Sequence, residues 1–286
     1  MTETRLPFEQ LVFSGGGLRC FWHGGLMEAL GPRAPDPARV TGSSGGALSA
    51  AAWIAGREEF LFDRFARALK RTDFNVTLDD MDADDGRSPH QRVYEAIVED
   101  ALDDAALARI ADGPAFQINV ATPGEASHPT LRALVGGTIY QAEQAVAPTP
   151  RPRLSSVVGL EQRLIDARQA ARDGALPELI RMAATVPPAF RPDEWPNAET
   201  GTPEPLYDGG MVDKAPLPEP DTGRTLVLLT KRFHTLPPDD GGRIIYIQPS
   251  ADVLSGSKLD FTDPELLHEA WAQGRRDGQA WLETQD

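Results

Sequence analysis

The sequence predicts an α/β fold, a three-layer α/β/α sandwich in which helices cover both faces of a central sheet. Short apolar runs alternate along the chain with longer segments of helical period, and this alternation is typical of packed sheet and helix layers. Glycine-rich turns follow two of the runs and lead into helical segments. Of the 286 residues, 41% are hydrophobic and 25% are charged, as in ordinary globular proteins. The length allows a substantial core, and we expect residues 1–286 to form a single domain.

The first two predicted strands each lead into a helix through a tight turn. Leu11-Val12-Phe13 is a short apolar run that ends at a glycine turn, and residues 18–30 then have helical character. Arg39-Val40-Thr41 predicts the second strand, and the apolar stretch 47–55 predicts a buried helix after a second turn. Both units therefore have the order strand, turn, helix.

Later segments continue the alternation. We expect further strands at Phe116–Val120, Thr225–Thr230 and Arg243–Ile247, and helices at Gln91–Asp103, Glu161–Arg172 and Asp263–Leu282. The proline-rich segments 148–152 and 187–220 are interpreted as irregular connections.

The segment Glu58–Arg71 predicts an amphipathic helix with two interpretations. One side carries Leu61, Phe62, Phe65, Ala68 and Leu69, and another carries Arg64, Arg67 and Arg71. The first interpretation is a helix packed on the core with a solvated basic face. The second is an interfacial helix that brings lipid to an active site.

Charge and cysteine content exclude several classes of protein. The chain has 28 basic and 43 acidic residues, a net charge of −15, which opposes binding to nucleic acid and to strongly anionic membranes. Cys20 is the only cysteine, so an intramolecular disulfide and a cysteine-based zinc site are excluded. No apolar run is long enough to cross a bilayer and the N-terminus lacks a signal peptide. We therefore expect a cytoplasmic protein.

An acidic segment at Asp79–Gly86 has the alternate aspartates of a calcium loop but not its other requirements. The sixth position is Asp85 rather than glycine, and the twelfth is Gln91 rather than glutamate. We interpret it as a solvated acidic loop and expect neither a metal nor another cofactor.

The turn Gly42-Ser43-Ser44-Gly45-Gly46 matches the G-x-S-x-G pattern. In that pattern a serine sits on a tight strand-to-helix turn, and the glycines keep side chains away from it. The predicted strand before the turn and the predicted helix after it supply the required context. Ser44 is therefore the candidate nucleophile.

The turn Gly15-Gly16-Gly17 can aim consecutive backbone N–H groups at one point, as acyl transfer requires for its oxyanion. A phosphate-binding loop or a simple tight turn are the alternatives. The dinucleotide fingerprint would place its last glycine at Cys20, and the Gly-Lys-Ser/Thr of a P-loop is absent. The oxyanion role is favoured. Arg19 is interpreted as a structural residue that ties the loop, with a phosphate-binding role as the alternative.

A nucleophilic serine needs a base, and the chain offers a well-framed aspartate but no well-framed histidine. The histidines are His23, His90, His128, His234 and His268. Only His23 lies near a functional turn, inside a helix where a packed structural histidine is favoured. Asp208 follows the apolar Leu206-Tyr207 and precedes Gly209 and Gly210, so its carboxylate is predicted to emerge at a strand end. Partial burial would make this carboxylate a stronger base.

These residues resemble the patatin-like phospholipase family, whose serine hydrolases use a Ser-Asp dyad. The resemblance rests on the loop Gly15–Arg19, the elbow Gly42–Gly46, the stretch Ala183–Phe190 and the turn Asp208–Gly210, in the family's order. It spans residues 9–217, leaving 218–286 for the final strands and a C-terminal helix. It implies a mainly parallel sheet, Ser44 as nucleophile, Asp208 as base, and the amides of Gly16 and Gly17 as the core of the oxyanion hole. Gly42, Gly45, Gly209 and Gly210 would support the site.

The chain departs from the family pattern just after the glycine loop. Cys20 stands where a glycine often closes that motif, and Phe21 and Trp22 are bulkier than the usual residues. We expect this to reshape the acyl pocket.

The expected function is that of a serine lipid acyl hydrolase of the phospholipase A or lysophospholipase type. Its substrate would be a phospholipid, a lysophospholipid or another acyl ester, met in transient contact with a membrane. One alternative is a carboxylesterase with a Ser-His-Asp triad whose base is His234 or His268. The other is a lipid-binding regulatory protein on a hydrolase fold.

Overall fold

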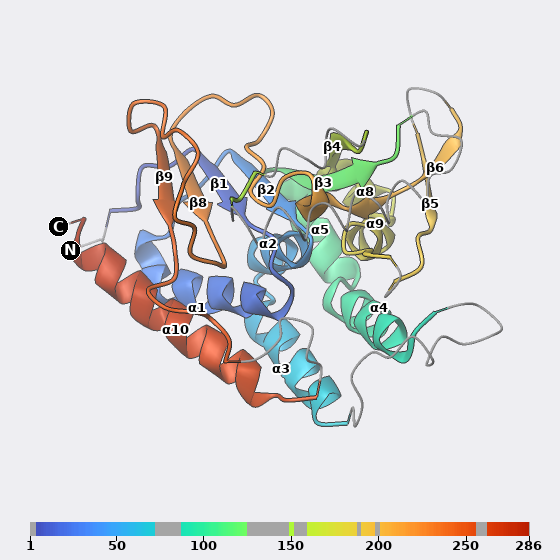
Figure 1. Cartoon of the computed structure of the whole chain (residues 1–286), viewed down its shortest axis with the longest axis horizontal. Coiled ribbons are helices and arrows are strands. Elements are labelled where there is room, and N and C mark those ends of the chain that lie inside the picture. The colour runs from blue at the N-terminus through green and yellow to red at the C-terminus, as the bar shows by residue number, and fades with distance from the viewer. Residues whose placement is uncertain are drawn as a thin grey trace.

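The structure is a computed structural model that describes residues 4–71, 87–124, 149–151, 159–187, 190–197, 201–255 and 262–285. At its centre is a seven-stranded sheet with the order β4-β3-β2-β1-β8-β9, and β7 pairs with β3 off this path. Its strands are β1 (Gln10–Phe13), β2 (Arg39–Ser43), β3 (Ala115–Thr122), β4 (Glu161–Asp166), β7 (Tyr207–Asp208), β8 (Thr225–Leu228) and β9 (Ile244–Ile247). Figure 1 shows them side by side across the molecule.

Most of the sheet is parallel. Every neighbouring pair from β3 through β2, β1 and β8 to β9 is parallel. β4 and β7 run antiparallel to β3. Helices connect β1 to β2 and β2 to β3, whereas an irregular segment, residues 229–243, connects β8 to β9. The predicted α/β fold with a central, mainly parallel sheet is confirmed.

Helices flank the sheet. They are α1 (Phe21–Leu30), α2 (Gly45–Ala55), α3 (Glu58–Leu69), α4 (Pro89–Ala101), α5 (Asp104–Asp112), α8 (Ala167–Arg172), α9 (Leu176–Met182) and α10 (Glu265–Glu283), with short 3₁₀ turns η1 (Gly17–Cys20), η2 (Gly31–Arg33) and η4 (Gly209–Met211). α10 lies along α1, and α4 packs between α3 and α9 (Figure 1). A separate hairpin joins β5 (Glu194–Pro196) to β6 (Pro203–Pro205).

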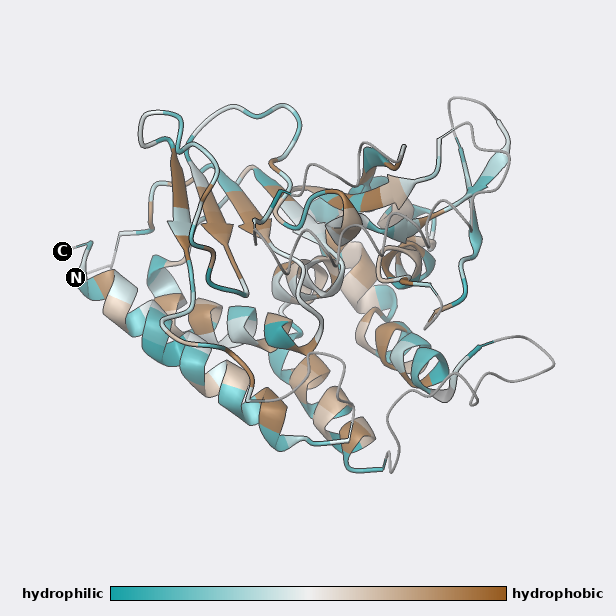
Figure 2. Ribbon diagram, viewed as in Figure 1, coloured by the Kyte–Doolittle hydropathy of each residue, from teal (hydrophilic) through white to brown (hydrophobic). Residues whose placement is uncertain are grey.

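The strands are hydrophobic on both faces, as buried parallel strands must be. Figure 2 shows the central strands as brown segments within a more polar surround. Leu11, Phe13 and Leu228 face the main core, beneath the helices. Val12 and Val227 face the other way, into a smaller cluster closed by residues such as Phe233 from irregular segments. The sheet is thus buried from both sides.

Most predicted elements are confirmed with small changes at their ends. One prediction is half wrong, because Glu161–Arg172 is a strand, β4, followed by the short helix α8 rather than one helix. The break falls at Asp166, whose carboxylate accepts the amides of Arg168 and Gln169 and so caps α8. Residues 161–166 instead all pair with β3, opposite its residues 117–122. Cross-strand pairing overrides the helical period of the sequence. Helices α5 and α9 are not among the predicted elements. The segment 187–220, interpreted as irregular, contains the short strands β5, β6 and β7 and the turn η4, because its strands find pairing partners within the segment and in β3.

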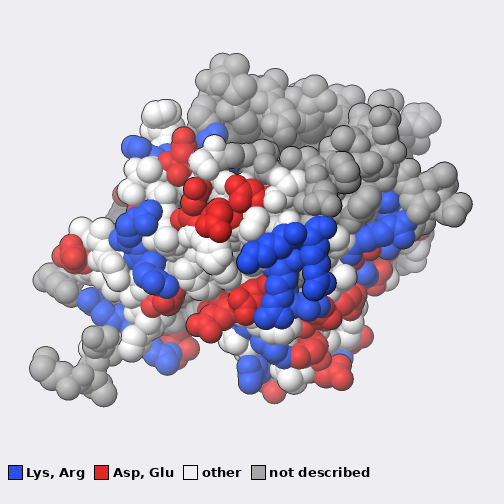
Figure 3. Space-filling model, turned by 90° about the horizontal axis from the view of Figure 1, so that it is seen from below, with Lys and Arg blue, Asp and Glu red and all other residues white. Residues whose placement is uncertain are grey.

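Helix α3 buries its apolar side, including Leu61, Phe65 and Leu69, as the packed-helix interpretation expects. On its basic side, Arg64 and Arg67 form ion pairs with Asp100 and Asp63, and Arg71 is exposed. Arg57, the residue before the helix, pairs with Asp103. Figure 3, which views the molecule from the side where α3 and α10 lie, shows basic side chains gathered next to acidic ones. These ion pairs support the interpretation that the basic side of α3 is a solvated surface.

Two predictions fall on parts of the chain outside the described residues. They are the acidic loop at Asp79–Gly86 and the two end residues, 148 and 152, of the proline-rich segment 148–152, whose residues 149–151 are irregular as predicted. In the described part of the chain, no helix combines the length and apolar character that a membrane span requires.

Candidate active site

Ser44 lies in the turn between β2 and α2. Its backbone has φ 53° and ψ −134°, a conformation that is strained for any residue with a side chain. The turn is tight because flanking glycines let backbone segments approach closely. A Cβ on Gly42 would lie 2.5 Å from the Cα of Ala47, and one on Gly46 would overlap the carbonyl of Phe13. The strand, turn and helix expected from the serine motif are all present.

Asp208 reaches Ser44 because β7 continues along β3 where β2 stops. The last pair between β2 and β3 joins Ser43 to Asn119, and the next residue of β3, Val120, pairs with Asp208. The aspartate therefore stands directly beyond the end of the strand that carries the serine. The hydroxyl of Ser44 donates a hydrogen bond of 2.6 Å to Oδ2 of Asp208.

The same aspartate is fixed from two other directions. Its Oδ1 accepts the amide of Gly210 at 2.7 Å, and its own amide donates to the carbonyl of Thr185 at 2.8 Å. Ser44 and Asp208 are each 9% exposed, so their hydrogen bond competes with little water. Thr185 belongs to the stretch 183–190, of which the structure describes all but residues 188 and 189, and it connects that motif to the site.

The glycine loop lies against the serine, since a Cβ on Gly15 would lie 3.2 Å from the Cβ of Ser44. The amide of Gly15, however, donates to the carbonyl of Lys214 at 2.8 Å. This amide is already engaged, so the candidate oxyanion donors narrow to Gly16 and Gly17. Gly17 has φ 58° and opens η1, and the first amides of a helix have no partner within it.

Arg19 is half-buried in η1. Its amide donates to the carbonyl of Gly16 at 3.3 Å, so its backbone helps to close the turn. The expected tie through its guanidinium is not seen in the described part of the chain, where that group makes no hydrogen bond or ion pair.

Bulky residues after the loop point away from the serine. Phe21 packs edge-on against Phe62 and Phe65 of α3, and Trp22 donates its indole N–H to Asp277 of α10 at 2.8 Å. They belong to the helix packing. Of Cys20, Phe21 and Trp22, only Cys20 lies beside the serine turn, since a Cβ on Gly45 would lie 3.1 Å from its Sγ.

The described histidines have other surroundings. Nε2 of His23 lies 3.2 Å from the carbonyl of Leu228, and burial lowers the pKa of this imidazole to about 3. His234 is exposed, and the exposed His268 packs its ring on Phe62, 4.9 Å between centroids. His90 is buried in α4. His128 lies outside the described residues. The partner that the described part of the chain offers to the Ser44 hydroxyl is a carboxylate.

Sequence reasoning missed the residue that holds the aspartate loop in place. The buried Asn119 donates from Nδ2 to the carbonyl of Gly209 at 3.0 Å and to that of Asp213 at 2.7 Å. Ser43 donates to the same Asp213 carbonyl at 3.1 Å. A signal was present, because a polar asparagine interrupts the apolar strand Phe116–Val120.

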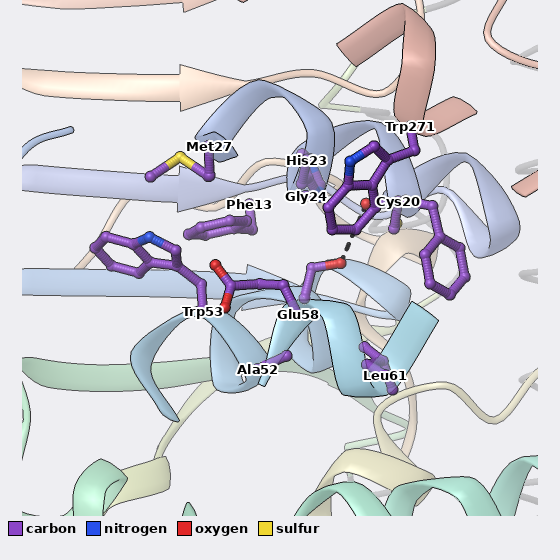
Figure 4. A pocket seen from close by; sticks show the side chains of 12 residues that line it. Phe13, Cys20, His23, Gly24, Met27, Ala52, Trp53, Glu58, Leu61 and Trp271 are labelled. Carbon is purple, nitrogen blue, oxygen red and sulfur yellow. Dashed lines mark hydrogen bonds between the residues drawn. The ribbon is translucent and has the colours of Figure 1, made fainter. Parts of the chain in front are cut away.

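A small crevice lined mainly by apolar side chains lies between α1, α2, α3 and α10. Its lining includes Cys20, so it adjoins the glycine loop. Figure 4 shows the carboxylate of Glu58 directed toward the rings of Phe13 and Trp53, with Trp271 on the other side. Burial raises the pKa of this carboxyl above its usual range. Among the described residues no group of histidine, cysteine and acidic side chains is arranged to hold a metal ion.

A strained serine on a strand-to-helix turn thus donates a hydrogen bond to a buried carboxylate within an α/β fold. The family model described as patatin-like phospholipase matches residues 11–221. The chain belongs to this family, whose members act on lipid esters.

Solved structures of similar fold were also found. The crystal structure of VipD from Legionella pneumophila is similar with 12% sequence identity and a TM-score of 0.49, over 98% of this chain and 68% of that one. No curated protein matches the sequence.

Proposed function

We propose that the chain is a serine lipid acyl hydrolase, of the phospholipase A or lysophospholipase type, that acts through a dyad of Ser44 and Asp208. The observation that carries this proposal is the 2.6 Å hydrogen bond from the serine hydroxyl to Oδ2 of the aspartate. Membership of the patatin-like phospholipase family supports a lipid ester as the substrate. Phospholipids, lysophospholipids and other acyl esters are the candidate substrates.

In the first half of the reaction, Oγ of Ser44 attacks the ester carbonyl while its proton passes to Asp208. The carbonyl oxygen becomes an oxyanion and accepts hydrogen bonds from the amides of Gly16 and Gly17. When the tetrahedral intermediate collapses, the bond to the alcohol oxygen breaks. That oxygen takes the proton from Asp208, and the acyl group stays on Ser44 as an ester.

In the second half, water replaces the alcohol. Asp208 accepts a proton from the water as its oxygen attacks the acyl-enzyme, and it returns that proton to Oγ of Ser44 when the fatty acid leaves. Gly210 supports both halves because its amide occupies Oδ1 and leaves Oδ2 directed at the serine. The carboxylate thereby keeps one orientation through both proton transfers.

The test compares Ser44→Ala with Ser49→Ala on a lipid panel, with products identified by mass spectrometry. Ser49 lies one turn further along α2, and its hydroxyl donates to the carbonyl of Cys20 at 3.3 Å. We expect Ser44→Ala to lower kcat by about 10⁴-fold or more and to abolish labelling by a fluorophosphonate probe. Ser49→Ala should keep the parent's kcat and its labelling by the probe. Equal turnover by Ser44→Ala and the parent would refute the assignment.

Histidine variants separate the dyad from a triad in the same assay. His234→Ala and His268→Ala should retain activity, because neither ring contacts the serine in the structure. A loss comparable to that of Ser44→Ala in either variant would replace the dyad by a Ser-His-Asp mechanism.

A further inference from the structure

Thr230 contacts the glycine loop at the peptide unit between Gly15 and Gly16. Its hydroxyl donates to the carbonyl of Gly15 at 2.8 Å, and its amide donates to Oγ of Ser14 at 3.0 Å. Thr230 is 2% exposed, so water competes little for these hydrogen bonds. The loop is therefore tied to Thr230 through two successive residues.

This contact follows from the register of the sheet. β1 and β8 are parallel neighbours, and their last pair joins Phe13 to Leu228. Gly15 and Thr230 each lie two residues beyond that pair, so the two chain segments leave the sheet side by side. Gly16 then lies so close that a Cβ on it would overlap Oγ1 of Thr230. Only glycine allows this approach.

The carbonyl of Gly15 and the amide of Gly16 belong to one trans peptide unit. The two groups point in opposite directions in a planar trans peptide, so a hydrogen bond that fixes the carbonyl also fixes the direction of the N–H. A hydrogen bond accepted by the carbonyl also polarises the unit and makes its N–H a stronger donor. Thr230 thus sets both the orientation and the strength of the Gly16 amide as a donor.

The Gly16 amide is available beside the serine. It donates no hydrogen bond to any residue of the described part of the chain, and Gly16 is half-buried. The preceding residue faces the nucleophile, since a Cβ on Gly15 would lie 3.2 Å from the Cβ of Ser44. The amide of Gly15 itself is engaged by Lys214. The amide of Gly16 is therefore the first free donor of the loop after its contact with Ser44.

We infer that Thr230 is a positioning residue of the oxyanion hole, which through the Gly15 carbonyl holds the Gly16 amide toward the oxygen that becomes negative on the bound ester. The inference rests on the proposed function. Because this oxyanion exists only after Ser44 has attacked, a correctly held donor stabilises the transition state more than the bound ester. Loss of the Thr230 hydroxyl should therefore lower kcat and leave KM almost unchanged.

The experiment compares Thr230→Val and Thr230→Ser with Thr225→Val, using p-nitrophenyl butyrate as substrate. Thr225 is a matched control, because it is a buried threonine at the other end of β8 whose hydroxyl donates to Oε1 of Gln10 at 2.7 Å. Wild type and Ser44→Ala are measured in parallel, and the unfolding temperature of every variant is recorded.

Inhibition by octyl trifluoromethyl ketone is the second measurement. Oγ of Ser44 adds to the ketone carbon, its proton passes to Asp208, and the ketone oxygen becomes an oxyanion that needs the same donors as the reaction. The corresponding alcohol has no carbonyl for the serine to attack and serves as the control ligand.

We expect Thr230→Val to lower kcat by about 10- to 100-fold, less than the loss of a whole oxyanion donor, with KM within about threefold of the wild type. The inhibition constant of the ketone should rise by the same factor as kcat falls, and that of the alcohol should stay unchanged. Thr230→Ser keeps the hydroxyl and should retain kcat within about threefold. Thr225→Val should lower Tm and keep kcat and KM.

Three results would overturn the inference while leaving the proposed function intact. The first is a Thr230→Val variant with the kcat of the wild type. The second is a raised KM with kcat retained, which would indicate a role in binding the ester before attack. The third is a loss in Thr230→Ser as large as that in Thr230→Val, which would assign the effect to packing of the methyl group.

If Thr230→Val does not fold, Thr230→Ala is measured with the same expectations, because it removes the hydroxyl without placing a new methyl group against Gly16. If the wild type is no more active than Ser44→Ala on the ester, the proposed function fails and the inference fails with it.

Discussion

Single residues of the site depend on neighbours that hold them in strained or buried states. Ser44 keeps a positive φ, which costs on the order of 1–3 kcal/mol, and its carbonyl accepts the amide of Ala47 at 2.9 Å at the start of α2. Asp213, whose carbonyl anchors Asn119, keeps a buried carboxyl. Each of these costs stability. Ser44 belongs to the proposed dyad, and the carbonyl of Asp213 accepts a hydrogen bond from the neighbouring Ser43. Such costs are commonly found at functional sites.

Asp213 gives a prediction about pH. Burial raises the pKa of its carboxyl from 3.8 to about 6, although Arg151, with Nε 3.2 Å from Oδ2, acts in the opposite direction. Because the folded chain holds this proton more tightly than the unfolded chain, its contribution to stability is complete below the unfolded pKa. That contribution is lost as pH rises through about 6.

The variant Asp213→Asn cannot titrate but keeps an oxygen for the Ala215 amide. Relative to it, the free energy of unfolding of the wild type should fall by about 2 kcal/mol between pH 4 and pH 6.5. Urea titrations at a series of pH values measure this difference. A difference that stays constant over the range would show that the Asp213 carboxyl is ionised throughout.

At the scale of elements, the helices α1 and α10 pack tightly against each other. The two helices lie along each other (Figure 1), and glycines make the contact unusually close. A Cβ on Gly274 would overlap the carbonyl of Trp22, and a Cβ on Gly25 would overlap that of Trp271. Trp22 also donates to Asp277 across this interface. The contact between the two helices therefore leaves no space for a methyl group at Gly25 or Gly274.

We therefore expect Gly274→Ala to destabilise the fold by about 3 kcal/mol through overpacking, despite the better helix propensity of alanine. Gln279→Ala, at an exposed position of the same helix, is the control and should change stability by less than about 0.5 kcal/mol. Chemical denaturation compares the two. Equal midpoints for Gly274→Ala and the control would mean that α10 can shift away from α1 at little cost.

At the scale of the whole molecule, the C-terminal part of the chain completes the sheet that the motif region begins. β8 pairs with β1 along its length, and β9 pairs with β8. We propose that residues 1–286 form one domain, because β1 would otherwise be an open edge and α1 would lose the helix that covers it.

A chain that ends at Leu217 should accordingly fail to unfold cooperatively and should precipitate, since an unpaired hydrophobic edge strand promotes aggregation. A chain that ends at Glu283, the last residue of α10, is the control and should retain the parent's unfolding temperature. Circular dichroism during heating measures both. A cooperative transition in the shorter chain would instead place a domain boundary near residue 217.

The order of the elements and the three glycine-flanked turns follow from the sequence, because each depends on local period and on backbone freedom that only glycine provides. The alternation predicts the α/β fold, and the turn at residues 42–46 identifies Ser44 without reference to distant contacts. Asp208 also stands out locally, as a carboxylate between an apolar pair and two glycines.

Contacts between segments far apart in the sequence decided three features that the local sequence pattern could not predict. Whether Glu161–Asp166 is strand or helix depends on β3, which accepts it as a partner. Which glycine amides can serve the oxyanion depends on Lys214, whose carbonyl engages Gly15. The aspartate meets the serine, across 164 positions of sequence, because β7 extends the sheet beyond the end of β2. The sequence by itself thus determined which groups are proposed to carry the chemistry. The tertiary structure decided their partners, since hydrogen bonds between remote segments leave no local trace.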